Sequence, residues 1–198
     1  MLFYFDLETT GLNQYHNKIT DICIIKENHS TERYCEKFST LVNPEESISD
    51  FITRLTGIDD EMVKDQPTFS QVAPNILNFL QNPNGVSYLV AHNCDGFDKL
   101  VLRIHFKNCN INTNKLNWKY IDTLLFAKKL YPTIYKHNLK NMIKILKLKD
   151  RDAHRAENDT LMLRDLYRKM CYDLSVKEKM DYDYIMKTPE YVWQYINN

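Results

Sequence analysis

Apolar residues occur along this chain in short runs whose spacing changes between the period of a strand and the period of a helix. Residues 2–8 are apolar on both alternating faces, which is typical of a strand buried in the middle of a sheet. Other segments carry apolar positions three and four residues apart, as helices with one buried face do. The predicted strands are residues 2–8, 19–27, 33–42, 86–91 and 118–121, and the predicted helices are residues 48–55, 69–81, 96–107, 123–130, 138–147 and 156–173.

The order of these elements predicts the fold class. Three consecutive strands can form an antiparallel meander, whereas the later strands are separated by helices and should run parallel. We therefore predict an α/β fold with a mixed five-stranded sheet flanked by helices. With 198 residues the chain can bury one good core. We expect one domain over residues 1–173, with residues 174–198 as an aromatic-rich helical extension of it.

Two acids stand at the carboxyl end of the first predicted strand. Because side chains alternate along a strand, Asp6 and Glu8 should point the same way, roughly 7 Å apart. Two carboxylates at that distance repel each other, and a divalent cation between them is the usual remedy. The alternative is an exposed strand end with two solvated acids.

A third acid belongs to the predicted helix 96–107. Asp98 lies on the apolar stripe of that helix, one turn before Leu102, so its carboxylate should face the sheet. The alternative is an acid that interacts with the helix dipole at the start of the helix. Asp95 fits such a terminal role better, because it precedes Gly96 and can cap the first turn.

A fourth acid and a histidine occur near the last predicted helix of the domain. Asp159 continues the apolar face formed by Leu163 and Leu166, so its carboxylate should point into the protein. His154 lies five residues earlier, about 140° away around a regular helix. Both can serve one site only if His154 is on the loop before the helix, where we expect it to be displaced in the absence of metal and nucleotide. The alternative is a surface imidazole.

Four carboxylates at the ends of core elements indicate one shared metal site. Buried acids need a partner or a metal, and no stripe of arginine or lysine accompanies them on those faces. Carboxylate oxygens suit Mg²⁺ or Mn²⁺. Two such ions roughly 3.5–4 Å apart stabilise the attacking and leaving oxygens of an in-line displacement, which points to phosphodiester cleavage. Asp122 opens the helix after its strand, and we expect it to be an N-cap rather than a ligand.

These segments resemble the three motifs of the DEDDh, or DnaQ-like, 3′-to-5′ exonucleases, the group that contains three-prime repair exonucleases and the proofreading epsilon subunit. The matching segments are Asp6–Gly11, Asn93–Asp98 and His154–Asp159, and the connecting residues 55–63, 67–69 and 121–124 match as well. The resemblance covers residues 1–172 and implies a ribonuclease H-like fold.

The resemblance also implies the role of each residue. Asp6, Glu8 and Asp159 would hold one Mg²⁺ or Mn²⁺, and Asp6 and Asp98 would hold or orient a second. His154 would be the general base, a task that suits an imidazole whose ordinary pKa is about 6.5. The expected activity is release of nucleoside 5′-monophosphates from DNA 3′ ends.

Recognition of the 3′ end is implied for four further residues. Thr9 would bind the terminal 3′-hydroxyl, and Leu12 would wedge against the last base. Leu55 and Phe97 would contact the terminal nucleotides, although all three apolar side chains could instead simply pack. Gly11 can adopt a positive φ and bring backbone close to a ligand.

Two other functions use the same pattern of residues. An RNA 3′ exonuclease of oligoribonuclease type would need the same acids and histidine, because tolerance of a 2′-hydroxyl does not show in the motifs. A noncatalytic nucleic-acid-binding or scaffolding protein usually lacks one of the ligands, and none is missing here.

Charge is balanced overall but uneven along the chain. The formal net charge is zero, so no global basic field attracts nucleic acid. A basic cluster nevertheless precedes His154, and in the predicted helix 138–147 two of its members are one turn apart on the polar face. These lysines are either a solvated face or contacts to a nucleic-acid backbone. The cluster consists of Lys128, Lys129, Lys136, Lys140, Lys144, Lys147, Lys149 and Arg151.

Other features bear on the surroundings of the protein. Its five cysteines are odd in number and form no CxxC pair, so neither a zinc site nor a disulfide framework is predicted. We expect an intracellular, reducing compartment (cytoplasm or nucleus), no secretory signal and no membrane span. The aromatic C-terminal residues either pack on the domain, which we favour, or bind a partner such as a polymerase. These residues are Tyr182, Tyr184, Tyr191, Trp193 and Tyr195.

Overall fold

A single mixed sheet organises the computed structural model, which describes residues 1–27, 36–83, 85–152 and 154–198. The strand order is β3-β2-β1-β4-β5; β1 to β3 pair antiparallel, and β4 and β5 run parallel to β1. The predicted α/β fold with a mixed five-stranded sheet is therefore confirmed. The strands are β1 (Leu2–Thr9), β2 (Ile19–Lys26), β3 (Glu36–Leu41), β4 (Ser87–Ala91) and β5 (Trp118–Asp122).

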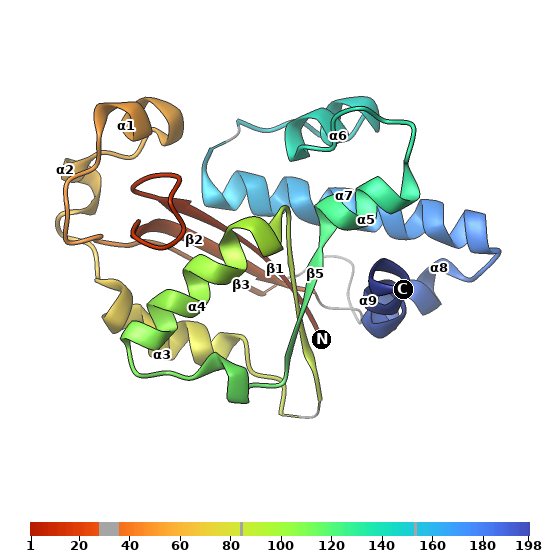
Figure 1. Ribbon diagram of the computed structural model, residues 1–198, viewed down its shortest axis with the longest axis horizontal. Helices are drawn as coiled ribbons and strands as arrows, with labels where there is room; N and C mark the ends of the chain where they lie inside the picture. The colour runs from red at the N-terminus through yellow and green to blue at the C-terminus, as the bar shows by residue number, and fades with distance from the viewer. Residues whose placement is uncertain (28–35, 84, 153) are drawn as a thin grey trace.

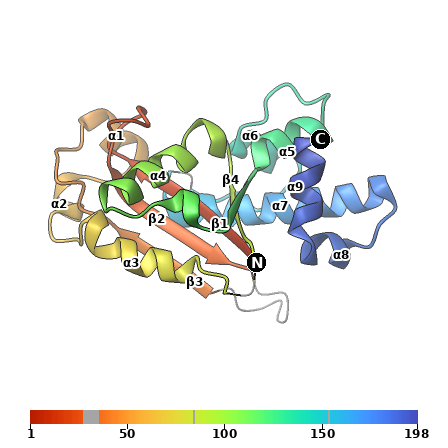
Figure 2. The ribbon, with the colours of Figure 1, turned by 60° about the horizontal axis from the view of Figure 1, so that its bottom comes forward.

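Helices cover both faces of the sheet (Figures 1 and 2). Alternate residues of β1 enter different cores: Phe3 and Phe5 pack with α3 and α4, whereas Tyr4 packs with α5, α6 and α7. Both faces of β1 are thus buried, as its apolar pattern predicted. The helices are α1 (Asp50–Thr56), α2 (Asp60–Val63), α3 (Phe69–Phe79), α4 (Asp98–Asn108), α5 (Thr123–Leu130), α6 (Leu139–Ile145), α7 (Ala156–Glu178), α8 (Tyr182–Lys187) and α9 (Pro189–Asn197), with short 3₁₀ turns η1 (Cys94–Gly96) and η2 (Thr113–Lys115).

Several boundaries differ from the sequence prediction. The helix expected from residue 96 begins at Asp98, because a 3₁₀ turn comes first and the residue before that turn, Asn93, has a φ of 62°. The cap expected from Asp95 is wrong: its carboxylate binds Lys99, and Phe97 occupies the N-cap position without a side-chain bond. Helix α2, which begins after the side-chain cap Asp59, was not predicted. Residues 33–35 of the third predicted strand lie outside the described residues.

The C-terminal segment packs back onto the domain. Ile185 of α8 and Val192 of α9 are fully buried in the core that also contains Tyr4. The boundary predicted between residues 173 and 174 falls inside α7. None of the described helices combines the length and the apolar character needed to cross a bilayer.

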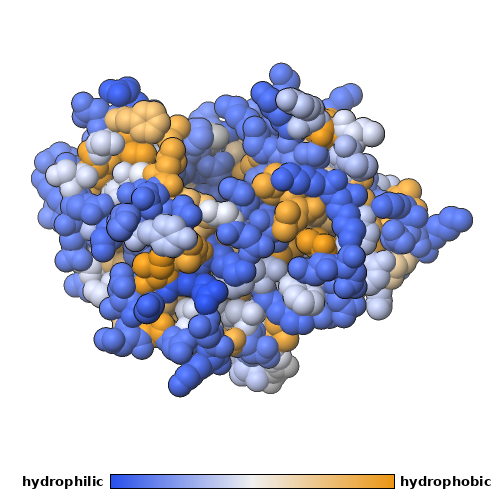
Figure 3. All heavy atoms as spheres, viewed as in Figure 1, coloured by the Kyte–Doolittle hydropathy of each residue, from blue (hydrophilic) through white to orange (hydrophobic). Residues whose placement is uncertain are grey.

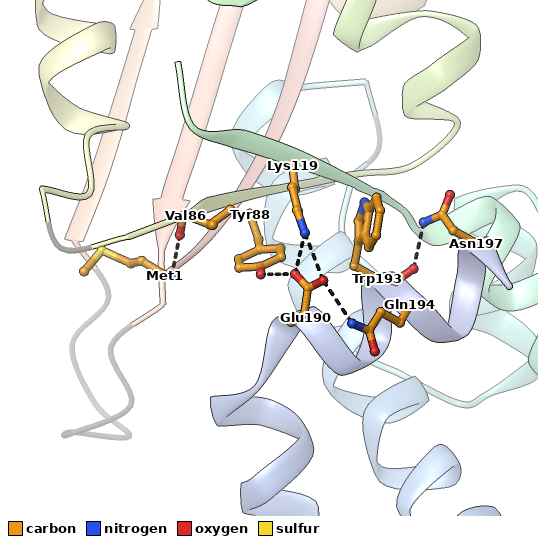
Figure 4. Close-up of polar contacts among 8 residues, drawn as sticks. All are labelled: Met1, Val86, Tyr88, Lys119, Glu190, Trp193, Gln194 and Asn197. Carbon is orange, nitrogen blue, oxygen red and sulfur yellow. Dashed lines mark hydrogen bonds and ion pairs between the residues drawn. The ribbon is translucent and has the colours of Figure 1, made fainter. Parts of the chain in front are cut away.

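Polar contacts fix α9 to the parallel half of the sheet (Figure 4). The carboxylate of Glu190 accepts hydrogen bonds from Tyr88 on β4 and from Lys119 on β5, with Lys119 Nζ 2.7 and 2.9 Å from the two oxygens. The same ammonium lies 4.2 Å from the ring centroid of Trp193. The last helix is therefore held to two strands by charge as well as by apolar packing.

Candidate active site

Four acids from three elements converge where β1 extends beyond β4. The last residue of β1 that pairs with β4 is Tyr4, so Asp6 and Glu8 lie past the end of that ladder. Asp98 is buried at the first position of α4, and Asp159 lies in the first turn of α7. Asp98, Asp159 and Glu8 are each close enough to raise the pKa of Asp6.

Burial and mutual repulsion strongly perturb these carboxyls. Burial raises the pKa of Asp6 well above its usual range, and its acidic neighbours raise it further. Burial, followed by the charges of Asp159, Asp21 and Asp98, raises the pKa of Glu8 to about 8. Burial likewise raises the pKa of Asp98 to about 7. Such a cluster resists ionisation on its own, and a divalent cation would compensate the charges, so the donor set fits a hard metal ion.

His154 lies beside the acids, on the loop before α7. A ring nitrogen of His154 and carboxylate oxygens of Glu8 and Asp159 all lie within 4.8 Å of one another. The backbone N–H of His154 donates to Asp159 Oδ2 at 2.8 Å, and the residue has a φ of 70°. The predicted loop position is confirmed. The ring lies beside Glu8 and Asp159 in this structure. Its displacement in the absence of metal and nucleotide stays a prediction.

A fifth acid and an arginine at the site were missed by the sequence reasoning. Asp21 on β2 pairs across the sheet with Glu8, and Arg155 Nε lies 3.4 Å from Asp21 Oδ2. Asp21 raises the pKa of Glu8, whereas Arg155 lowers it. The antiparallel register of β1 and β2 would have placed Asp21 opposite Glu8, but that register cannot be fixed from the sequence.

Asp122 holds the turn that leads to Asp98. Its carboxylate accepts N–H bonds from Leu124 at 2.8 Å, from Asn93 at 3.0 Å and from Asp95 at 3.2 Å. The first of these bonds confirms the predicted N-cap of α5. The other two tie the turn after β4 to the end of β5, a role that the sequence did not reveal.

His92 connects the end of β4 to the loop before α6. Its Nδ1 lies 2.9 Å from Thr123 Oγ1, and its Nε2 donates to the carbonyl of His137 at 2.8 Å. Burial lowers the pKa of His92 to about 4, so the ring is neutral near pH 7. Sequence reasoning assigned no role to this residue.

The residues expected at the 3′ end occupy different environments. Leu12 is 71% exposed and Leu55 is 36% exposed, so neither is buried in the core. Phe97 is partly buried against the core. Thr9 is buried, and its hydroxyl donates to the carbonyl of Gly11 at 2.6 Å. Their contacts with nucleotides stay a prediction.

Gly11 does not have the positive φ that the sequence suggested. Among the described residues, the glycine with a positive φ is Gly57. Gly11 meets a different constraint, because a Cβ built there would lie 2.6 Å from Asn17 Nδ2. The glycine therefore permits a close approach within the turn after β1.

A pocket of about 620 Å³ adjoins the acids. Asp6, Asp159 and His154 line it, together with Lys140 and Lys144 of α6. The surface is recessed between the atoms over α1 and the mainly hydrophilic atoms over α6, and apolar atoms gather over α1 (Figure 3). Phe51 and Leu55 are the exposed apolar residues of α1.

Comparisons with known proteins place the chain in a family. Residues 3–167 match the family model RNase_T, described as Exonuclease. The chain is 33% identical over 166 residues to DNA polymerase III PolC-type of Caldanaerobacter subterraneus, covering 84% of the chain but 11% of the relative. It is 29% identical to DNA polymerase III subunit epsilon of Treponema pallidum, covering 84% of the chain and 74% of that protein. The chain thus spans about a tenth of the PolC-type relatives.

Solved structures agree with this assignment. Exonuclease X in complex with 5′ overhanging duplex DNA superposes with a TM-score of 0.67 at 26% identity, over 87% of this chain and 92% of that one. Exonuclease I shares the fold with a TM-score of 0.74 at 15% identity, over 94% of this chain and 43% of that one. The match of the family model over most of the chain decides the point: the chain belongs to the RNase_T exonuclease family and has its DnaQ-like fold.

Proposed function

We propose that the protein is a metal-dependent 3′-to-5′ exonuclease that releases nucleoside 5′-monophosphates from DNA 3′ ends. One observation carries the proposal: buried and partly buried acids from β1, α4 and α7 converge, with a ring nitrogen of His154 beside two of them. A nuclease needs both features, a cradle for cations that neutralise the phosphate and a base that activates water.

Exonucleases of this type use divalent metal ions, and four residues of this chain would hold them. Asp6, Glu8, Asp98 and Asp159 offer only oxygen ligands, which suits two Mg²⁺ or Mn²⁺. When bound, the ions would offset the carboxylate charges and stabilise the negative charge that develops on the phosphate.

His154 would act as the general base. A ring nitrogen of His154 can accept a proton from the attacking water, and its position next to Glu8 and Asp159 puts it at the edge of the cradle. The bond from its own backbone N–H to Asp159 sets the distance between base and acids. Thr9, Leu12, Leu55 and Phe97 would hold the terminal nucleotides: Thr9 ends β1, Leu12 lies in the turn after it, Phe97 precedes α4, and Leu55 is partly exposed on α1.

The relatives support DNA as the substrate. The structure of exonuclease X contains duplex DNA with a 5′ overhang, which has a recessed 3′ end, and exonuclease I has been seen with single-stranded DNA. The sequence relatives are DNA polymerase III proteins. Because these relatives are polymerase proteins, we also propose that a polymerase binds the C-terminal segment.

The test is hydrolysis of end-labelled single-stranded DNA, mismatched duplex and RNA with Mg²⁺, Mn²⁺ or EDTA. We expect mononucleotides released from DNA 3′ ends, dependent on the metal. Asp6→Ala and Asp159→Ala should abolish nucleotide release and leave a folded protein. The control Asp65→Ala changes an exposed acid outside the site and should keep nucleotide release. Internal cuts or activity in EDTA would overturn the proposal, and a preference for RNA would favour an oligoribonuclease-type enzyme.

A further inference from the structure

Three lysines at four-residue spacing line the pocket that also contains Asp6 and Asp159. Lys136 precedes α6, and Lys140 and Lys144 follow on the helix, one turn apart and about 6 Å along its axis. Met142 and Ile143 are buried on the other side of the helix. That burial leaves the ammonium groups at the pocket, and Lys140 is near enough to lower the pKa of Asp159.

Lys140 lies near Asp159, but none of the three lysines forms an ion pair with a described acid. Lysines elsewhere on the domain do pair with acids, as Lys37 does with Glu157 and Lys169 with Asp173. No described carboxylate lies within ion-pair distance of Lys140 or Lys144. Because the chain as a whole has zero net charge, these unpaired positive charges are a feature of the local surface and do not follow from an excess of basic residues.

Hydrogen bonds fix the segment that carries these lysines relative to β4. The side chain of Asn138 caps α6 by accepting the N–H of Asn141 at 2.9 Å, and Asn141 Nδ2 donates to the carbonyl of Lys136 at 2.5 Å. His92, at the end of β4, bonds to the carbonyl of His137. The lysines are therefore positioned by the same segment that leads to Asp98.

We propose that Lys140 and Lys144, assisted by Lys136, bind the phosphodiester backbone of the strand being degraded, on the 5′ side of the scissile phosphate. The inference rests on the proposed function. With the scissile phosphate at the acids, only one nucleotide lies on its 3′ side, so every additional phosphate within reach belongs to the 5′ side. Lysine suits the task because it meets phosphates as a point charge and reads no base.

Direct binding of a labelled single-stranded oligonucleotide in EDTA tests the inference without hydrolysis. Each lost phosphate contact should flatten the slope of log affinity against log salt by about 0.7, so K140E/K144E should flatten it by about 1.4 and make the loss of affinity between 50 and 200 mM salt about sevenfold smaller. The matched control is K128E/K149E, which makes the same change of charge at two exposed lysines of the basic cluster that do not line the pocket. Equal slopes for both variants would overturn the inference, because only net charge would then matter.

A small substrate separates this inference from the proposed function. The p-nitrophenyl ester of thymidine 5′-monophosphate carries the scissile phosphate but no 5′ neighbour. K140E/K144E should lose much less activity on this ester than on a single-stranded oligonucleotide, with each rate compared with that of K128E/K149E. An equal loss on both substrates would place the lysines at the scissile phosphate and overturn the assignment. If the wild-type protein cleaves neither ester nor DNA while the binding difference persists, the nuclease function fails and the backbone contact stands.

Discussion

At the scale of single residues, Asp122 shows how a carboxylate outside the acid cluster shapes the site. It satisfies three backbone N–H groups at once, two of them in the turn that connects β4 to Asp98. That turn contains Asn93 at a φ of 62°, a left-handed conformation that asparagine adopts more readily than most residues. The bonds to Asp122 hold the turn in place, so the position of Asp98 depends on a residue that does not line the pocket.

Asp122→Ala should therefore impair both stability and activity. Removing the carboxylate leaves three partly buried N–H groups without their acceptor, which should cost about 1–3 kcal/mol in total. Urea denaturation would measure that loss, and nucleotide release should fall with it because Asp98 loses its support. Asp95→Ala in the same turn removes an exposed ion pair with Lys99 and is expected to cost about 0–1 kcal/mol. Similar losses for the two variants would show that Asp122 has no special role.

Residues differ in how far the sequence could predict them. The burial of Asp98 and the loop position of His154 followed from helical periodicity, which needs no tertiary information. Asp21 and Arg155 could not be found that way, because their place depends on the register of two strands and on the path of a loop. Gly11 does not have the positive φ considered from the sequence; its close neighbour is the side chain of Asn17.

At the scale of elements, the C-terminal helices complete the core on one face of the sheet. The core around Tyr4 and Tyr167 includes Ile185 of α8 and Val192 of α9, so α5 and α7 alone do not enclose it. The apolar spacing correctly indicated that α7 buries one face, but its extension to Glu178 was missed. The last turns of α7 are covered by residues that follow it in the chain, and such support is invisible to a local pattern.

Substitution of one buried residue measures the support from α8. Ile185→Ala should lower the free energy of unfolding by about 2–5 kcal/mol, because a large aliphatic side chain leaves a cavity in the core. Its neighbour Tyr184 is 51% exposed, and Tyr184→Ala is expected to change stability by at most about 0.5 kcal/mol. Chemical denaturation distinguishes the two. Small effects at both positions would indicate that α8 is a detachable tail.

At the scale of the whole molecule, the acid cluster ties stability to pH and to cations. The folded-state pKa of Glu8 is about 8 and that of Asp98 about 7, both far above the values of a free carboxyl. Groups with raised pKa values bind more protons in the folded state than in the unfolded state. Their favourable contribution is complete below about pH 4 and is lost as the pH rises through 7 and 8.

The metal-free protein should therefore become less stable between pH 5 and pH 8.5. The melting temperature in EDTA should fall over this range, by about 2–4 °C for each kcal/mol lost. Mg²⁺ should raise it more at pH 8 than at pH 5, because the ion binds ionised carboxylates. Thermal denaturation across pH provides the measurement, and Asp98→Asn, which removes one of the titrating groups, should flatten the curve. A melting temperature that rises from pH 5 to pH 8.5 in EDTA would contradict the assigned pKa directions.

The pairing between β1 and β4 ends at Tyr4, and β1 continues without it. This difference in strand length has a consequence for how the fold can evolve. Because β1 outruns its parallel neighbour, the recess belongs to the strand lengths rather than to the acids that line it. A descendant that exchanged its acids for neutral residues would lose catalysis, yet it would keep the groove and shed the repulsion between buried carboxylates. Inactive members of such a lineage should thus arise readily and be more stable than their active ancestors, and they would be suited to holding a strand end without cutting it.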